Sequence, residues 1–156
     1  MTSRIDRRLQ ELGIILPEPS VPPAVYSPTH FAAGIVTVSG QPPYRNGMPL
    51  YFGKVGRDLS LAEGVKSARL SALNVLAHLK QICEGDLDRV TGCVRMLVAV
   101  QADSDFHDIH HVADGASGLF TDIFTPLPPP TRTSLGCAAL PMNIATEVEA
   151  SFTIRY

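Results

Sequence analysis

Residues 144–154, IATEVEASFTI, alternate between two kinds of side chain along the chain. One set is almost entirely apolar and consists of Ile144, Thr146, Val148, Ala150, Phe152 and Ile154. The other set is mostly polar and consists of Ala145, Glu147, Glu149, Ser151 and Thr153. Because successive side chains of a strand point to opposite faces, this pattern predicts a strand with one face in the core and one polar face.

The segment just before this strand has the same period of two. Residues 132–139 read RTSLGCAA, and residues 140–143, LPMN, separate them from the strand that follows. We therefore predict an antiparallel hairpin closed by residues 140–143. In that hairpin the polar face carries Arg132, Ser134, Glu147 and Glu149.

Two helices are predicted upstream of the hairpin. Ser60 and Glu63 have the spacing of a capping box, an apolar stripe follows them, and Gly85 ends the predicted helix over residues 60–83. A second helix is expected from Asp103 or Ser104 to about Phe124, where a proline-rich stretch stops it.

Shorter signals complete the order of elements. A short helix is predicted over residues 3–12, and the proline-rich residues 17–30 favour an extended segment. Strands are predicted over residues 31–41, over residues 91–102 and, after the Asn46-Gly47 turn signal, over residues 48–52.

This order predicts an α+β domain in which both main helices cover one face of a mostly antiparallel sheet. The opposite face would be left bare, and small sheets commonly cover such a face with copies of themselves, so we expect a symmetric oligomer. We divide the chain into a helix-and-linker extension over residues 1–20 and one domain over residues 21–156.

Composition excludes several classes of protein. The 156 residues carry a formal net charge of -2, which argues against nucleic acid as a partner. The three cysteines have no zinc or disulfide spacing. No apolar run reaches the length of a membrane span and the N-terminus lacks a signal-peptide pattern, so we expect a soluble cytoplasmic protein without a membrane partner.

Two spaced motifs resemble a known family. PTRTSLGCAALPMNIATEVEA (130–150) is similar to the C-terminal signature of the Rid family, the YjgF-type enamine/imine deaminases, at the arginine, the Leu-Pro pair and the paired acidic residues. VYSPTHFAAGIVTVSGQPP (25–43) resembles the tyrosine- and Ser-Gly-Gln-containing segment of the same family. Residues 53–60, 72–80 and 112–120 look closer to an uncharacterised bacterial branch, and together the resemblance covers about residues 20–156.

The resemblance implies a chorismate-mutase-like fold, a homotrimer and a ligand cleft between neighbouring subunits. It also implies hydrolysis of reactive acids of the 2-iminobutanoate and 2-iminopropanoate type, without a cofactor or metal. In this hypothesis Arg132 binds the carboxylate, because its planar fork matches a carboxylate bidentately, and Glu147 directs the attacking water. The ligand would also contact Tyr26, Ser39, Gly40 and Ser134.

The chain departs from the deaminase pattern at three positions. Ser134 stands where well-studied deaminases have a cysteine, Ala113 where they have an asparagine, and Val25 where the proline before the tyrosine stands. Loss of the asparagine would enlarge the cleft, so a deaminase of a larger aminomuconate-like enamine remains an alternative. A non-catalytic, ligand-binding trimer is another, and Glu149 competes with Glu147 for either acidic role.

Geometry limits the predicted site. In the predicted hairpin Arg132 and Glu147 share a face but lie about 13 Å apart along the strands, which is too far for a substrate of a few carbons. Unless a bulge shifts the register, the two side chains must come from neighbouring chains. His107 and His111 have the spacing of a helical metal pair, but we interpret them as part of a polar helix face, since no third ligand of fitting spacing follows.

Overall fold

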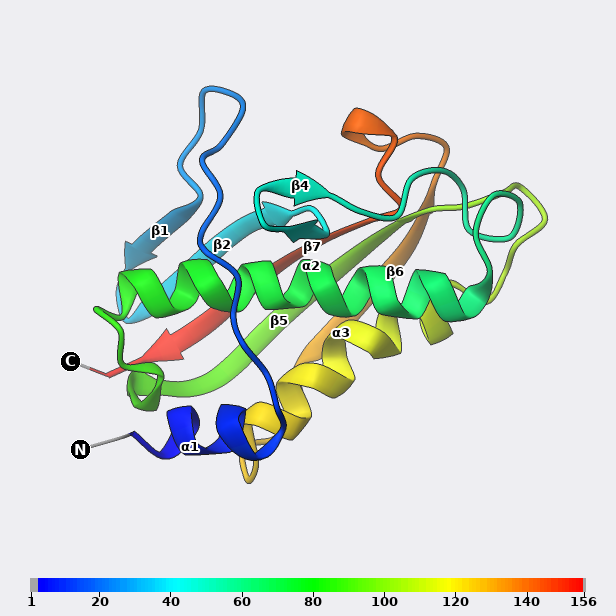
Figure 1. The fold of residues 1–156 in the computed structure, drawn as a ribbon. Helices are drawn as coiled ribbons and strands as arrows, with labels where there is room; N and C mark the ends of the chain where they lie inside the picture. The colour runs from blue at the N-terminus through cyan, green and yellow to red at the C-terminus, as the bar shows by residue number, and fades with distance from the viewer. Residues whose placement is uncertain (1–2, 156) are drawn as a thin grey trace.

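A five-stranded sheet forms one layer of the molecule, and the helices form the other. The computed structural model describes residues 3–155 (Figure 1). The strands lie in the order β1 (Thr29–Ala32), β2 (Ile35–Gln41), β7 (Thr146–Ile154), β5 (Val90–Gln101) and β6 (Thr131–Cys137). The helices are α1 (Arg4–Glu11), α2 (Leu61–Ile82) and α3 (Ile109–Phe124), with single 3-10 turns at Leu87–Arg89 and Pro141–Asn143.

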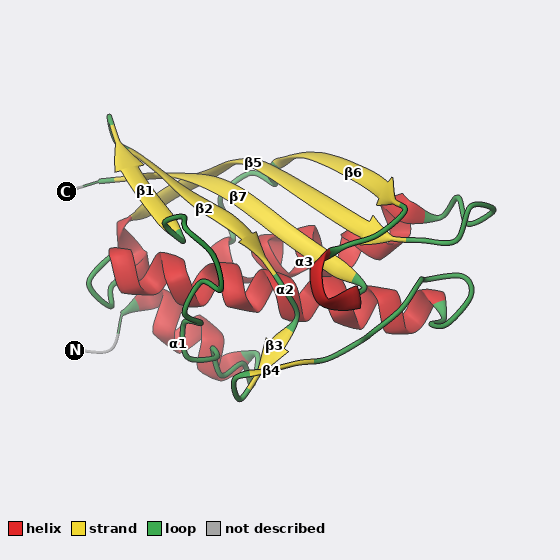
Figure 2. Ribbon diagram, turned by 90° about the horizontal axis from the view of Figure 1, so that it is seen from above, coloured by secondary structure: helices red, strands yellow, loops and turns green. Residues whose placement is uncertain are grey.

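All three helices lie on the same side of the sheet, as Figure 2 shows. This confirms the predicted two-layer α+β architecture. A separate two-stranded hairpin, β3 (Tyr44–Arg45) and β4 (Met48–Pro49), turns at Asn46 and Gly47, both of which have positive φ. Among the described residues, no helix is both long enough and apolar enough to span a membrane.

Strand β7 has the two faces that its alternation predicts. Thr146, Val148, Ala150, Phe152 and Ile154 are buried, and the residues between them are exposed or half-buried. The strand lies in the middle of the sheet, between β2 and β5, and it pairs antiparallel with both of them. Its apolar face therefore meets α2, the helix that packs against it.

The predicted hairpin between residues 132–139 and 144–154 is wrong. β5 lies between β6 and β7, and β6 pairs with β5 in parallel after the chain has crossed over through α3. This is a βαβ unit, in which a helix between two strands returns the chain to the same end of the sheet. β6 is a strand as predicted, but its burial does not alternate and Leu135 of its expected core face is exposed. Its neighbour and its direction follow from the crossover and not from the nearest strand in sequence.

The crossover also reverses the face on which Arg132 lies. Arg132 is the register partner of Met96, whose side chain is buried on the helix side of the sheet. Arg132 therefore points toward α3, whereas Glu147 lies on the opposite face of the sheet. The expectation that Arg132, Ser134, Glu147 and Glu149 share one face is wrong for this reason.

The helix signals are borne out for α1 and α2, and α3 begins later than predicted. Ser60 and Glu63 form the capping box of α2, and the Ser3 hydroxyl accepts a hydrogen bond from the Asp6 backbone N–H in α1. α3 begins at Ile109, because the Asp103 backbone donates to the Val55 carbonyl and holds the preceding residues in a loop.

The predicted strand over 31–41 is two strands, since Ala33 and Gly34 both take positive φ and turn the chain between β1 and β2.

The N-terminal extension shares the core of the domain. Ile5 and Leu9 of α1 are buried within the same apolar cluster as the sheet and the two long helices. From α1 the chain continues as a proline-rich segment, residues 17–28, that crosses in front of α2 and reaches β1 (Figure 1). We call residues 17–28 the strap.

Candidate functional site

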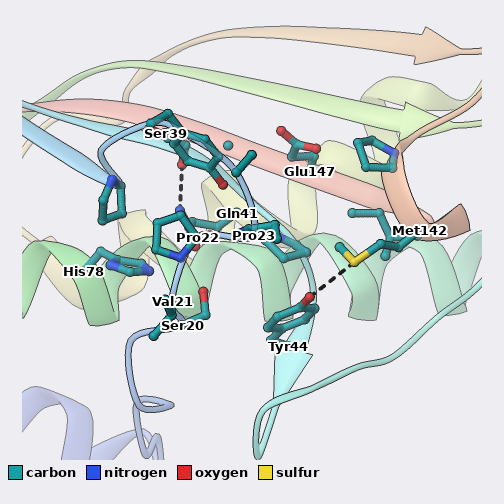
Figure 3. A pocket seen from close by; sticks show the side chains of 17 residues that line it. Ser20, Val21, Pro22, Pro23, Ser39, Gln41, Tyr44, His78, Met142 and Glu147 are labelled. Atoms are coloured by element: carbon teal, nitrogen blue, oxygen red, sulfur yellow. Dashed lines mark hydrogen bonds between the residues drawn. The ribbon is translucent and has the colours of Figure 1, made fainter.

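The strap closes one side of a cavity of about 320 Å³. Residues from the strap, the end of β2, α2, the loop after β6 and β7 line this strap cavity (Figure 3). Its walls are largely apolar, with Pro22, Pro23, Pro42, Met142 and Ile144 among them. Proline has a fixed backbone and no N–H group, so it offers a ligand no hydrogen-bond donor. The few polar side chains of the cavity are therefore the groups that can orient a ligand by hydrogen bonds.

Ser39 ties the strap to the sheet. Its hydroxyl donates to the Ser27 carbonyl over 2.7 Å, and its backbone N–H donates to the Pro28 carbonyl over 2.9 Å. Tyr26 is therefore held at the rim of the cavity, with 45% of its surface exposed. Both donors of Ser39 are used in these contacts, so its main effect in this structure is to position Tyr26.

A β-bulge brings Gly40 against Glu147. The pairing of β2 with β7 runs through Val38 and Ala150 and resumes at Gln41 and Val148, which leaves one extra residue in β2. A Cβ at Gly40 would collide with the Glu147 carboxylate, so only glycine leaves room for it. The bulge thus holds Glu147 in the wall of the strap cavity.

The environment of Glu147 favours its protonated form. Burial, and to a lesser extent the negative charge of Glu149, raises the pKa of the Glu147 carboxyl above its usual value. A carboxyl with a raised pKa holds and releases a proton more readily near neutral pH, which is the property of a general acid or base. Glu149 on the same strand is exposed.

The structure thus brings together four of the six residues predicted for the site. Tyr26, Ser39, Gly40 and Glu147 all line the strap cavity. Arg132 and Ser134 do not: both lie on the edge strand β6, three strands away from β2.

Arg132 lies in a second, open groove between β6 and α3. Its Nη1 donates to Asp114 Oδ1 in an ion pair over 2.6 Å and to the Ser117 hydroxyl over 2.9 Å. Both hydrogen bonds that Arg132 makes within the described residues use this one nitrogen. Its Nε and Nη2 make no hydrogen bond within the described residues. Pro129 and Pro130 complete the groove, which we call the Arg132 groove.

One protomer cannot join Arg132 to Glu147 through a small ligand. Glu147 is in register with Ala99 of β5, and Ala99 is in register with Leu135 of β6. Arg132 is a further three residues along β6, about 10 Å at the rise of a strand, and it emerges from the other face of the sheet. The expectation of a shared face is wrong, and within one protomer these two side chains do not meet at one small ligand.

Two positions that depart from the deaminase pattern have different surroundings. Ala113 is fully buried in the core, so the expectation that it enlarges a cleft is wrong. Its neighbour Asp114 contacts Arg132 instead, which puts a polar group of α3 beside the guanidinium. Ser134 is half-buried, two residues after Arg132 on the same strand and therefore on the same face.

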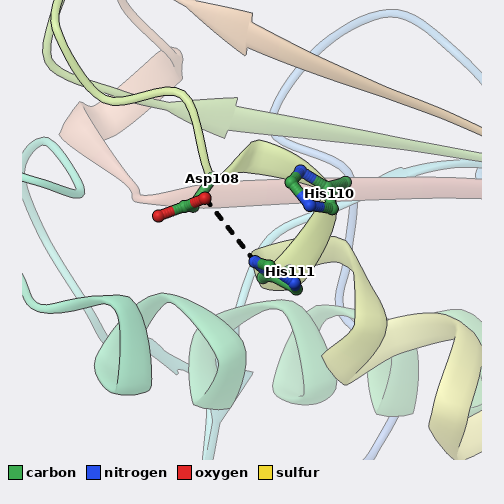
Figure 4. Close-up of side chains that lie close together, drawn as sticks. All are labelled: Asp108, His110 and His111. Atoms are coloured by element: carbon green, nitrogen blue, oxygen red, sulfur yellow. Dashed lines mark ion pairs between the residues drawn. The ribbon is translucent and has the colours of Figure 1, made fainter.

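The two histidines of α3 form a surface cluster with the residue just before the helix. His107 precedes the helix, so the predicted helical pair with His111 does not form. Asp108, His110 and His111 instead gather at the first turn, with ligand atoms within 4.8 Å of one another (Figure 4). His111 Nδ1 lies 3.6 Å from Asp108 Oδ1, and all three side chains are exposed, as on an ordinary polar helix face.

The three cysteines are free thiols, of which Cys83 is buried and the other two are half-buried. Burial raises the pKa of Cys93 to about 12, and it also raises the pKa of the Cys83 thiol. Thiols in this state are poor nucleophiles.

Most residues of the strap cavity were not predicted from the sequence, and three of them bring in functional groups. His78 comes from α2, Tyr44 from β3 and Met142 from the turn after β6, and the Tyr44 hydroxyl donates to Met142 Sδ over 3.4 Å. A histidine within the apolar face of a helix was the one available signal. Tyr44 and Met142 reach the cavity only because the two loops fold toward each other.

Comparison with known proteins agrees with this architecture. Residues 6–149 match a family model described as "YjgF/chorismate mutase-like, putative endoribonuclease". Protein TCP17 of Trypanosoma cruzi is 35% identical over 151 residues, which covers 96% of this chain and 93% of that protein.

Two solved structures extend the comparison. The crystal structure of "a putative endoribonuclease" from Shewanella oneidensis MR-1 is 30% identical with a TM-score of 0.93, covering 96% of this chain and 99% of that one. The YjgF gene product of Escherichia coli is 22% identical with a TM-score of 0.63, covering 88% of this chain and 94% of that one, and shares the fold. The match to the family model spans most of the chain, and the chain therefore belongs to the YjgF/chorismate mutase-like family.

Proposed function

We propose that this chain hydrolyses small, reactive imine or enamine acids, converting them with water into 2-keto acids and ammonia. The observation that carries the proposal is that an acidic and a basic side chain lie in separate hollows on two sides of the protomer. A carboxyl with a raised pKa lines a cavity on one side of the protomer, and an arginine with unused donors lies in a groove on the other side.

The assembly is part of the proposal. We infer a closed trimer in which the Arg132 groove of one protomer meets the strap cavity of the next, because such head-to-tail contacts close into rings. The bare face of the sheet supports this inference. It carries apolar side chains of large exposed area, with Ile35 at 41% and Leu135 at 48%. Contact with another copy would remove these surfaces from water.

The proposed reaction needs only an anchor and a proton carrier. Nε and Nη2 of Arg132 bind the substrate carboxylate, which fixes the C=N carbon beside Glu147 of the neighbouring protomer. The ionised Glu147 takes a proton from water as its oxygen adds to that carbon, and a tetrahedral carbinolamine forms. Glu147 then returns that proton to the nitrogen of the carbinolamine formed from the protonated imine. As the C–N bond breaks and ammonia leaves, Glu147 takes the hydroxyl proton and the C=O bond forms.

A coupled assay tests this function. The protein is added to an amino-acid dehydratase that releases 2-iminobutanoate, and the formation of the keto acid is followed. We expect wild type to accelerate it, Glu147→Gln to lose at least about 100-fold of that acceleration, and Arg132→Ala to lose at least about tenfold. Glu149→Gln is the matched control, since it changes an exposed acid on the same strand, and it keeps most of the activity.

Equal rates for wild type, both site variants and no protein would contradict the proposal for these substrates. Activity confined to large dicarboxylic enamines would favour an aminomuconate-type deaminase. Binding of keto acids without turnover would identify a ligand-binding trimer.

A further inference from the structure

Helix α2 carries two buried polar side chains on the face that the strap covers. Asn74 is 0% exposed and His78 is 2% exposed, and their spacing of four residues places them on one side of the helix. Asn74 Nδ2 donates to the Tyr44 and Leu70 carbonyls, each over 2.9 Å. Asn74 Oδ1 and both ring nitrogens of His78 have no hydrogen-bond partner among the described residues.

Such groups are expensive to keep in a core. A buried donor or acceptor without a partner destabilises a protein by about 1–3 kcal/mol, and native structures retain few of them. These three are the buried side-chain atoms of the described residues that lack a partner, and all lie on this one stripe of α2. Their clustering points to a shared partner that enters from outside the chain.

The stripe borders the strap cavity. His78 lines the cavity itself, and Asn74 lines an adjoining hollow that shares Ser20, Val21 and Tyr44 with it. In Figure 3, His78 comes from the helix layer and Glu147 from the sheet, with the proline walls near them. The cavity therefore has an acidic group from β7, an apolar middle and a neutral polar group from α2.

The cavity is larger than a short imino acid requires. Its volume of about 320 Å³ is at the lower end of the range for sites that hold drug-sized ligands. A substrate of four carbons bound at Glu147 would leave most of the apolar wall without a partner. A ligand with a longer side chain would cover it.

We propose that the strap cavity binds the side chain of the substrate: an apolar body that ends in a hydroxyl or amide group, hydrogen-bonded to His78. This inference rests on the proposed function, because it takes the carboxylate of the same ligand to be bound by the neighbouring Arg132 and its imine carbon to lie beside Glu147. It makes the substrate an imine of a large hydroxyl- or amide-bearing amino acid.

The chemistry of the two buried groups selects a neutral end. Burial lowers the pKa of His78, so the imidazole is uncharged and offers one donor and one acceptor. A hydroxyl or an amide matches both. Asn74 Oδ1 offers a further acceptor in the adjoining hollow, one turn of α2 away. A charged end would be buried without a counter-ion, which is strongly unfavourable.

Binding of three keto acids to the full-length protein tests this inference. The probes are 2-oxobutanoate, phenylpyruvate and 4-hydroxyphenylpyruvate, the last two differing only in one hydroxyl, and affinities are measured by calorimetry. We expect wild type to bind the hydroxylated acid about tenfold more tightly than phenylpyruvate. In His78→Leu this ratio falls to about one, and in His78→Gln, which keeps a donor and an acceptor, part of the preference remains.

The design separates failure of this inference from failure of the proposed function. Thermal unfolding without ligand shows whether each variant is folded. If 2-oxobutanoate binds in an Arg132-dependent manner but the hydroxyl gives no preference, or the preference survives in His78→Leu, the side-chain site is overturned and the function stands. If the His78-dependent preference appears but Arg132→Ala binds every acid normally, the carboxylate anchor is overturned. Failure of all three acids to bind overturns both.

Discussion

At the scale of single residues, the protonation of Glu147 is the property on which the proposed chemistry depends. Its carboxylate lies against Gly40 in the wall of the strap cavity, and burial raises its pKa. The folded state therefore binds this proton more tightly than the unfolded state does. As a result, the free energy of unfolding falls as the pH rises from the ordinary value of a glutamate through the raised value.

This linkage predicts the behaviour of Glu147→Gln. The variant lacks the titration, so its free energy of unfolding relative to wild type should rise as the pH increases above the ordinary value of a glutamate, about 4.3, and level off above the raised pKa. Urea unfolding at a series of pH values measures the difference. Glu149→Gln, which removes only the lesser cause of the shift, should keep most of the wild-type pH dependence. A difference that stays constant over this range would show that the Glu147 pKa is not raised.

At the scale of the elements, α1 is fixed to the domain by a side chain from another part of the chain. Asp88, in the 3-10 turn Leu87–Arg89, accepts hydrogen bonds from the backbone N–H groups of Arg4 and Ile5, each over 2.8 Å. Lys80 of α2 adds an ion pair with Asp6 over 2.7 Å. Asp88 thus satisfies two of the free donors of the first turn, and together with the ion pair it holds α1 and its buried Ile5 against the core.

Asp88→Ala should lower the free energy of unfolding by about 1 kcal/mol, within the usual range of about 0.5–2 kcal/mol for a lost N-cap. Chemical denaturation measures this value. Asp105→Ala, at an exposed acid in the loop before α3, is the control and should change stability little. If the two variants are equally stable, Asp88 does not anchor the helix.

The same scale shows which parts of the fold could be predicted. The ends of α1 and α2 follow from capping residues a few positions apart, so the sequence contains the whole signal. The two faces of β7 follow from its alternation for the same reason. The neighbour of β6 could not be found in this way, because the alternation of side chains along a strand does not show which strand pairs with it. With that neighbour unknown, the face of Arg132 was assigned incorrectly.

At the scale of the whole molecule, the candidate site divides between two sides of the protomer. Tyr26, Ser39, Gly40 and Glu147 could be predicted to gather, since they flank strands whose motifs resemble those of the Rid family. His78 could not, because its contact with the cavity depends on the path of the strap over α2. The separation of Arg132 from Glu147 is what makes a second copy of the chain necessary in the proposed mechanism.

Mixing two inactive variants tests this shared site most directly. Arg132→Ala and Glu147→Gln subunits are co-expressed or refolded together in equal amounts, and imine hydrolysis is compared with that of each variant alone. A site that takes Arg132 from one protomer and Glu147 from the next is intact in about a quarter of the clefts of randomly mixed trimers. The account therefore predicts recovery of about a quarter of the wild-type activity. Mixed trimers that stay as inactive as the separate variants would contradict it.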